Sequence, residues 1–319
     1  MHIPDGFLSP GVAAATWVVA GASLALALRA ERREAAPMPS GILGSIAAFL
    51  FAAQMVNVPV APGTSGHLVG GMLAAVVLGP WRALLALAAV LAVQALLFQD
   101  GGLTAFGANF IDMGIAGPLV GYAVARLASR GRRGPRGLAA GAIVGAFAAT
   151  VCGAALAALW LAASGLYPLR GILPVMLVTH VAIGLLEAAL TGAVLVTLLQ
   201  WRPDLANGIG AAAADRRPAA LALGMFGVAL LLAAFVAPFA SALPDGLDAT
   251  AKALGFASKA QPAWTAPMPD YGLPWPRIAI AAPAVAGILG TVAVAVLAWA
   301  ISRSLALRSH AVRDDAAHR

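Results

Sequence analysis

The chain has 319 residues, of which 61% are hydrophobic and only 10% charged, and its formal net charge is +7. Such a composition excludes an ordinary soluble enzyme and indicates a polytopic membrane protein, for which the bilayer takes the place of water. A single cysteine, Cys152, excludes a disulfide framework or a thiolate metal cluster built from one chain. The excess of basic residues could indicate nucleic-acid binding, but the arginine positions follow membrane topology instead.

Apolar runs predict an all-α polytopic membrane protein with seven spans followed by two more. The runs lie at residues 11–28, 41–58, 68–80, 83–98, 108–127, 138–163, 172–199, 219–240 and 278–301. A polar segment at 202–218 predicts a linker between a domain at 1–201 and a two-span module at 219–319. That module carries a proline-rich loop at 241–277, which holds both lysines of the chain.

The basic residues predict one orientation of the chain in the membrane. With the N-terminus outside, 16 of the 18 arginines fall on the cytoplasmic side, together with the C-terminus; the exceptions are Arg170 and Arg277. The cytoplasmic set is Arg29, Arg32, Arg33, Arg82, Arg126, Arg130, Arg132, Arg133, Arg136, Arg202, Arg216, Arg217, Arg303, Arg308, Arg313 and Arg319. No basic residue precedes the first span, so we expect an uncleaved anchor with Met1 at the external face.

The chain opens "MHIPDGFL", with a histidine directly after the first residue. The terminal amine of Met1, the amide nitrogen of His2 and the His2 imidazole can close a five- and a six-membered chelate ring around one divalent metal. Displacing the amide proton favours Ni(II) and Cu(II), then Co(II). One position stays open, and His67 in "APGTSGHLVGG" is the histidine that topology places at the outer face. Alone, a histidine at position 2 or in a loop is more often incidental.

Several polar residues near the expected outer face could hydrogen-bond the ligands or shape the loops around them. They are Asp5, Asn57, Ser65, Asp100, Asn109 and Asp112. Turn formation explains Asp5 and Ser65 equally well, and helix capping explains Asn109 and Asp112.

A rival hypothesis rests on the seventh span, where His180 and Glu187 share one helix face. Ionisable groups inside a bilayer are candidates for an ion path. The protein would then be a secondary carrier or channel for divalent cations, with an incidental His2. An interhelical hydrogen bond is the structural explanation of the same pair. A metal-sensing receptor is a third class that the sequence leaves open.

Four stretches carry a resemblance to a known family. "MHIPDGFL", "FAAQMVNVPVAPGTSGHLVGG", "LGPWRALLALAAVLAVQALLFQDGGLTAFGANFIDMGIAGP" and "THVAIGLLEAALTG" resemble the NikM/CbiM family, the substrate-binding components of energy-coupling-factor nickel and cobalt transporters. The later stretches "ALPDGLDATAKALGF" and "PDYGLPW" resemble the PDGLE domain, a form of the NikN/CbiN accessory subunit. Together they account for the whole chain.

The resemblance implies a metal held by Met1, His2 and His67, with Ni(II), or alternatively Co(II), as the transported substrate and no prosthetic group. It also implies a transmembrane T component (NikQ/CbiQ-like) and ATPase subunits (NikO/CbiO-like) as partners in a bacterial or archaeal cell membrane. The sequence contains no Gly-x-x-x-x-Gly-Lys-Ser/Thr motif for cradling phosphates. We therefore expect a transporter component that is not itself an enzyme and binds no nucleic acid.

Overall fold

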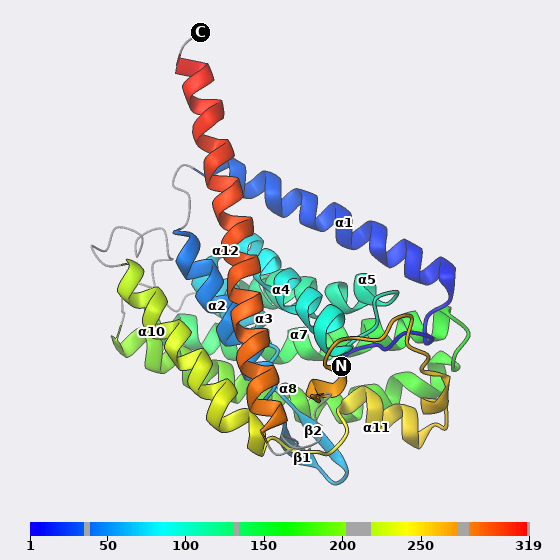
Figure 1. Ribbon diagram of the computed structural model, residues 1–319. Helices are drawn as coiled ribbons and strands as arrows, with labels where there is room; N and C mark the ends of the chain where they lie inside the picture. Colours follow the sequence, from blue (N-terminus) through cyan, green and yellow to red (C-terminus); the bar gives the residue numbers. More distant parts are fainter. Residues whose placement is uncertain (35–38, 131–133, 202–217, 274–280, 318–319) are drawn as a thin grey trace.

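The computed structural model describes residues 1–34, 39–130, 134–201, 218–273 and 281–317. The helices are α1 (Pro10–Arg33), α2 (Ser40–Gln54), α3 (Gly71–Leu78), α4 (Pro80–Val93), α5 (Phe106–Asn109), α6 (Tyr122–Ala128), α7 (Pro135–Ala163), α8 (Leu169–Trp201), α10 (Pro218–Leu231), α11 (Gly246–Ala253) and α12 (Ala282–Ala317) (Figure 1). π-Helices follow α4 at Gln94–Phe98, α5 at Phe110–Gly121 and α10 at Leu232–Val236, and 3-10 turns lie at Ala237–Phe239, Ala257–Lys259 and Pro269–Tyr271. Strands β1 (Val58–Ala61) and β2 (Thr64–Gly66) form an antiparallel hairpin. The predicted all-α class is confirmed.

Seven helical segments of the described chain are long and apolar enough to cross a membrane. They are Pro10–Arg33, Pro80–Phe98, Phe106–Ala128, Pro135–Ala163, Leu169–Trp201, Ala219–Phe239 and Ala282–Ala306. Proline stands at the start of α1, α4 and α7, where its missing N–H has no helical partner to lose. The chain is therefore a multi-pass membrane protein.

The other two predicted spans, 41–58 and 68–80, are not full-length spans. They form α2, with 15 residues, and α3, with 8, whereas a span needs about 20. Between these helices the chain leaves helical structure at Met55 and makes the hairpin and the His67 loop. All eight residues of α3 and most of α2 are buried in protein, which is where irregular backbone is tolerated at membrane depth.

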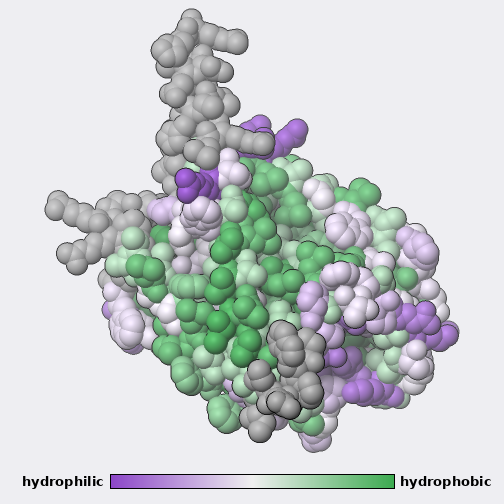
Figure 2. All heavy atoms as spheres, in the orientation of Figure 1, coloured by the Kyte–Doolittle hydropathy of each residue, from purple (hydrophilic) through white to green (hydrophobic). Residues whose placement is uncertain are grey.

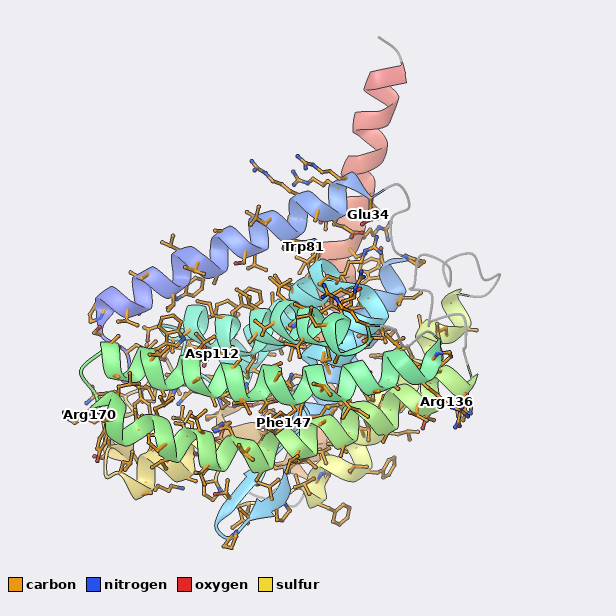
Figure 3. All side chains as sticks on the ribbon, turned by 180° about the vertical axis from the view of Figure 1, so that it is seen from behind. Glu34, Trp81, Asp112, Arg136, Phe147 and Arg170 are labelled. Atoms are coloured by element: carbon orange, nitrogen blue, oxygen red, sulfur yellow. The ribbon has the colours of Figure 1, made fainter. Side chains whose placement is uncertain are left out.

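Polar and apolar side chains are separated on the surface. Figure 2 shows a broad apolar area over α12 and its neighbours, with hydrophilic side chains gathered beyond it. At one end Arg82 Nε lies 2.5 Å from Glu31 Oε2, which joins α4 to the end of α1. Arg136 and Arg170 lie at opposite ends of the α7–α8 pair, as the predicted topology requires (Figure 3). Of the other arginines predicted to be cytoplasmic, Arg132, Arg133, Arg202, Arg216, Arg217 and Arg319 lie outside the described residues.

The last two long helices pack against α2. Ser45 Oγ on α2 donates to the carbonyl oxygen of Ala222 on α10 at 2.7 Å. A Cβ added to Gly44 would lie 2.8 Å from the carbonyl oxygen of Ala295 on α12, so the backbones approach closely there. The linker predicted at 202–218 lies outside the described residues apart from Pro218.

The N-terminus lies in the interior of the molecule, beside α8 and α11 (Figure 1). Met1, Ile3 and Phe7 are buried. The loop between α10 and α12 passes the same segment, where the Gln261 N–H donates to the Asp5 carbonyl oxygen at 2.9 Å. The fold therefore brings the first residues and the C-terminal module together.

Candidate metal centre

The first three residues are held in place by Asn109. The Ile3 N–H donates to Asn109 Oδ1 at 2.7 Å, and Asn109 Nδ2 donates to the Ile3 carbonyl oxygen at 3.0 Å. The Gly102 N–H donates to the same carbonyl at 2.9 Å. A Cβ at Gly101 would lie 2.9 Å from Asn109 Nδ2, so this close approach needs glycine. Buried reciprocal bonds of this kind fix where Met1 and His2 lie.

Asp5 ties the N-terminal segment to two loops. Its Oδ1 accepts from the Thr104 N–H at 2.7 Å and the Thr104 hydroxyl at 2.6 Å, while its Oδ2 accepts from the Ala263 N–H at 3.0 Å. With both oxygens used in this way, Asp5 orients the chain that carries the candidate ligands.

The Met1 amine is paired with a carboxylate from the C-terminal module, Asp245. Asp245 Oδ1 also accepts from the Asp248 N–H at 2.8 Å, which caps the first turn of α11. Burial alone raises the pKa of the Asp245 carboxyl, but the charge of the Met1 amine and the Asp248 N–H outweigh it and hold that pKa well below its usual range. The carboxylate is therefore ionised at neutral pH.

The two candidate imidazoles lie next to each other. The ring centroids of His2 and His67 are 5.8 Å apart and the rings are stacked at 20°. Burial lowers the pKa of His2, against the opposing effect of Asp100. Burial and the charge of the Met1 amine lower the pKa of His67 to about 4. Both rings are therefore neutral near pH 7, the form that binds metals.

Asp100 links His2 to the C-terminal module. His2 Nδ1 lies 3.1 Å from Asp100 Oδ1, and the Tyr271 hydroxyl donates to Asp100 Oδ2 at 2.6 Å. Burial and the Asp100 charge raise the pKa of Tyr271 well above its usual value, so the phenol keeps its proton. The module thus contacts both ends of the candidate chelate, the amine through Asp245 and the imidazole through Asp100.

The loop after His67 is held by Glu187 of α8. Glu187 Oε2 accepts from the Val69 N–H at 2.6 Å, and Oε1 accepts from the Gly70 N–H at 2.8 Å. Gln54 Nε2 donates to the Val69 carbonyl oxygen at 2.9 Å. Both carboxylate oxygens of Glu187 are therefore engaged by backbone at the start of α3. This geometry favours the structural explanation of Glu187 over an ion path.

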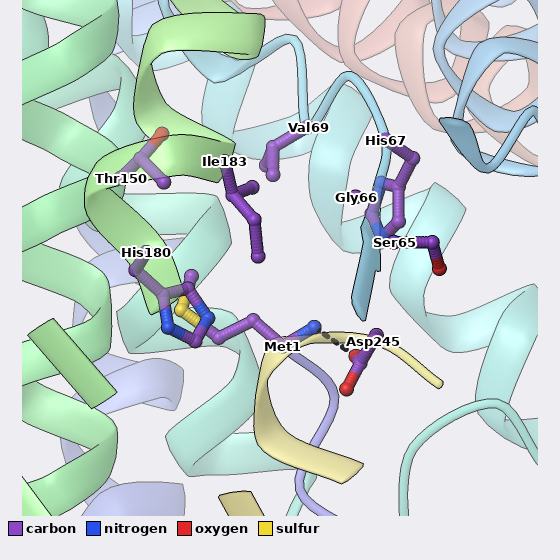
Figure 4. A pocket seen from close by; sticks show the side chains of 9 residues that line it. All are labelled: Met1, Ser65, Gly66, His67, Val69, Thr150, His180, Ile183 and Asp245. Atoms are coloured by element: carbon purple, nitrogen blue, oxygen red, sulfur yellow. Dashed lines mark hydrogen bonds and ion pairs between the residues drawn. The ribbon is translucent and has the colours of Figure 1, made fainter. Parts of the chain in front are cut away.

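A small cavity lies between the N-terminus, the His67 loop, α8 and Asp245. Its volume is about 10 Å³, room for about one water-sized sphere. It is lined by Met1, Ser65, Gly66, His67, Val69, Thr150, His180, Ile183 and Asp245 (Figure 4). Across the described ranges no three His, Cys, Asp or Glu side chains converge as a metal cluster. Metal binding here would therefore depend on main-chain nitrogens.

Of the remaining predicted residues, Ser65, Asn57 and Asp112, one lines this cavity and two do not. Ser65 lines it, and its hydroxyl and N–H donate to the carbonyl oxygens of Leu243 and Pro244 at 2.7 and 2.9 Å, directly before Asp245. Asn57 and Asp112 do not line it. Asp112 Oδ1 accepts from Trp160 Nε1 at 2.8 Å, a contact between neighbouring helices.

Sequence reasoning missed Asp245 and Tyr271 as parts of the site. Both stand in the PDGLE-like stretches, and Pro244-Asp245-Gly246 repeats the Pro4-Asp5-Gly6 of the N-terminus. That repeated tripeptide was the available signal, although two tripeptides by themselves do not identify a contact.

The fold and the cavity define a helical membrane protein with a nitrogen-rich site around its own N-terminus. Residues 2–205 match the family model described as the cobalt uptake substrate-specific transmembrane region, CbiM, and residues 219–307 match the PDGLE domain. The chain belongs to the CbiM family and carries a PDGLE domain behind the CbiM region.

Named relatives cover most of the chain. It is 35% identical over 305 residues to a putative fused nickel transport protein NikMN of Archaeoglobus fulgidus, covering 95% of this chain and 98% of that protein. It is 33% identical over 312 residues to the fused nickel transport protein NikMN of Rhodobacter capsulatus, covering 85% and 88%. A crystal structure of a transition metal transporter matches with a TM-score of 0.56 and 32% identity, covering 63% of this chain and 93% of that one.

Proposed function

We propose that this protein is the substrate-capturing component of a nickel transporter, with cobalt as the alternative substrate. The ion is held by the Met1 amine, the amide nitrogen and imidazole of His2, and the imidazole of His67. The observation that carries this proposal is the convergence of the buried Met1 amine with the stacked His2 and His67 rings beside a cavity of about 10 Å³. The names of the two fused NikMN relatives support nickel.

The donor set favours nickel on chemical grounds. An amide nitrogen binds a metal when it loses its proton, and ions that form strong planar fields with nitrogen, such as Ni(II), favour this exchange. In the six-membered chelate ring the imidazole donor is His2 Nδ1, and in the structure this nitrogen faces Asp100. When the metal binds, the His2 imidazole must therefore give up its contact with Asp100 and bind the metal instead.

Asp245 keeps the site electrically balanced in both states. Without metal, its carboxylate is paired with the Met1 ammonium. With Ni(II) and a deprotonated amide the complex carries one positive charge, which the same carboxylate compensates. Buried charges are tolerated when they are paired in this way.

Capture alone does not move an ion across a membrane. We propose that the chain works in an energy-coupling-factor assembly with a T component and ATPase subunits. Membership of the CbiM family supports this assembly. The arginine distribution supports an extracytoplasmic capture site and a cytoplasmic C-terminus. The separate family matches at 2–205 and 219–307 support domains at 1–201 and 219–319.

Metal analysis of the full-length protein with an unmodified N-terminus tests the proposal. We expect about one nickel ion per chain and the visible absorption of a planar four-nitrogen Ni(II) site. His67→Ala removes one donor and is expected to abolish this spectrum. A His67→Ala protein that binds nickel with the same stoichiometry and spectrum contradicts the assignment.

A further inference from the structure

His180 lines the same cavity as Met1 and His67 but is not needed for the proposed capture site. Its side chain is fully buried in α8, and Nε2 has no hydrogen-bond partner among the described residues. A buried polar atom without a partner is costly in a protein interior, so it calls for a physical reason.

The protonation of the His180 ring follows from its other nitrogen. Nδ1 lies 2.8 Å from the Met176 carbonyl oxygen, one helical turn earlier. A carbonyl oxygen accepts hydrogen bonds and cannot donate, so Nδ1 carries the proton and Nε2 carries a lone pair. An imidazole whose N–H is held by a backbone carbonyl is the usual arrangement of a histidine metal ligand.

His180 also lies well inside the helix bundle. It is 11 residues after the first residue of α8, which is about 16 Å along the helix axis. In Figure 4 its ring lies beside the Met1 side chain, and the Met1 amine points toward Asp245. Met1, His67 and His180 line the same small cavity, so His180 is a neighbour of the candidate capture site on the side of α8.

Gly246 brings the C-terminal module into contact with this ring. A Cβ added at Gly246 would lie 2.6 Å from His180 Cε1 and 2.8 Å from Nε2, so the position accepts no larger residue without displacement. Gly246 directly follows Asp245, which pairs with the Met1 amine. One short segment of the module thus touches both the candidate capture site and His180.

We propose that His180 is a transfer ligand, which takes the metal ion from the capture site on its way into the membrane. This inference rests on the proposed function. The step is a ligand exchange in which a metal–nitrogen bond of the chelate is replaced by one to His180 Nε2. A single imidazole holds a divalent ion far less tightly than a multidentate chelate, which suits a ligand that must pass the ion on.

The test separates capture from transport by using three variants of the full-length chain. His180→Asn keeps an N–H donor for the Met176 carbonyl and removes the Nε2 lone pair. Thr191→Val is the matched control, because Thr191 is also fully buried on α8 but does not line the cavity, and its hydroxyl has no hydrogen-bond partner in the part of the chain that the structure describes. His67→Ala reports on the capture site itself. Nickel binding is measured on purified protein, and 63Ni uptake is measured in cells with the transport partners.

We expect His180→Asn to bind nickel with the wild-type stoichiometry and spectrum. Its nickel uptake should fall by about tenfold or more, because removal even of a group that only supports a metal ligand has an effect of this size. Thr191→Val is expected to keep both. Uptake by His180→Asn at the wild-type rate overturns the transfer role, and so does loss of capture or of co-purifying partner subunits in that variant. If His67→Ala keeps full nickel binding, the proposed function itself fails, and this outcome is distinct from the others.

Discussion

The amino group of Met1 and the carboxylate of Asp245 form an ion pair between residues 244 positions apart in the chain. Met1 directly precedes the CbiM match, which begins at residue 2, and Asp245 lies in the PDGLE domain. The pair therefore joins the two parts of the protein at the atom proposed to bind the metal. It follows that the PDGLE domain contributes a side chain to the candidate site.

Asp245→Asn tests whether this carboxylate balances the charge of the bound ion. The variant leaves the positive nickel complex without its counter-charge, so we expect nickel affinity to fall by about 10- to 100-fold. Isothermal titration with nickel measures this. Asp248→Asn is the control, since Asp248 contributes its backbone N–H to Asp245 and its side chain is not part of the cavity. Equal affinities of the Asp245 and Asp248 variants would show that the side-chain charge is irrelevant.

Asn109→Ala tests whether the N-terminal segment must be preorganised. The substitution removes both hydrogen bonds between Asn109 and Ile3, so the buried Ile3 N–H and carbonyl oxygen each lose a partner. This loss should cost about 1–3 kcal/mol in the stability of the segment. Nickel affinity should fall by about tenfold or more. Thr150→Val, which changes the cavity wall without touching this segment, should stay within about twofold of wild type. A normal affinity for Asn109→Ala would contradict positioning by this residue.

Nickel binding should release protons from main-chain nitrogens and not from the His67 imidazole. Because the pKa of His67 is lowered to about 4, its ring is already neutral above about pH 5 and has no proton to lose. The ion-paired Met1 ammonium and the His2 amide each lose one when they bind the metal, so we expect about two protons per nickel ion and an affinity that rises with pH. Titration in weakly buffered solution with a pH electrode counts them. Release of less than one proton would exclude the amine and amide as donors.

Glu187→Gln distinguishes a structural role from an ion path. A glutamine has one acceptor oxygen and cannot serve both the Val69 and Gly70 N–H groups, so thermal stability should fall, by about 1–3 kcal/mol in the free energy of unfolding. The folded variant should still bind nickel with an affinity close to that of the wild type, since the His67 side chain itself is intact. Lost uptake at unchanged stability and unchanged capture would favour the carrier hypothesis instead.

The sequence predicted the membrane class and the convergence of Met1, His2 and His67. It could do so because long apolar runs form helices wherever the bilayer removes water, and because a chelate made by two adjacent residues depends on local geometry. His67 was selected because the predicted topology placed its loop on the same face as Met1.

Other features depended on tertiary packing that no local pattern encodes. The segment 68–80 is apolar enough for a span, yet only eight of its residues are helical in α3, because the loop before it is held by Glu187 and Gln54. Ser65 binds the backbone directly before Asp245 and so helps to hold the Asp245 carboxylate near Met1. Such contacts join residues that are far apart in sequence, so the motif alone could not reveal them.

The most direct measurement is nickel affinity after addition of Gly-Ser before Met1. The extension replaces the Met1 amine by an amide and displaces it from Asp245, while the same two residues added after Arg319 serve as the control. The account predicts that the N-terminal extension lowers nickel affinity by about 100-fold or more and that the C-terminal one has no effect. Undiminished nickel binding and an unchanged absorption spectrum in the N-terminally extended protein would contradict it.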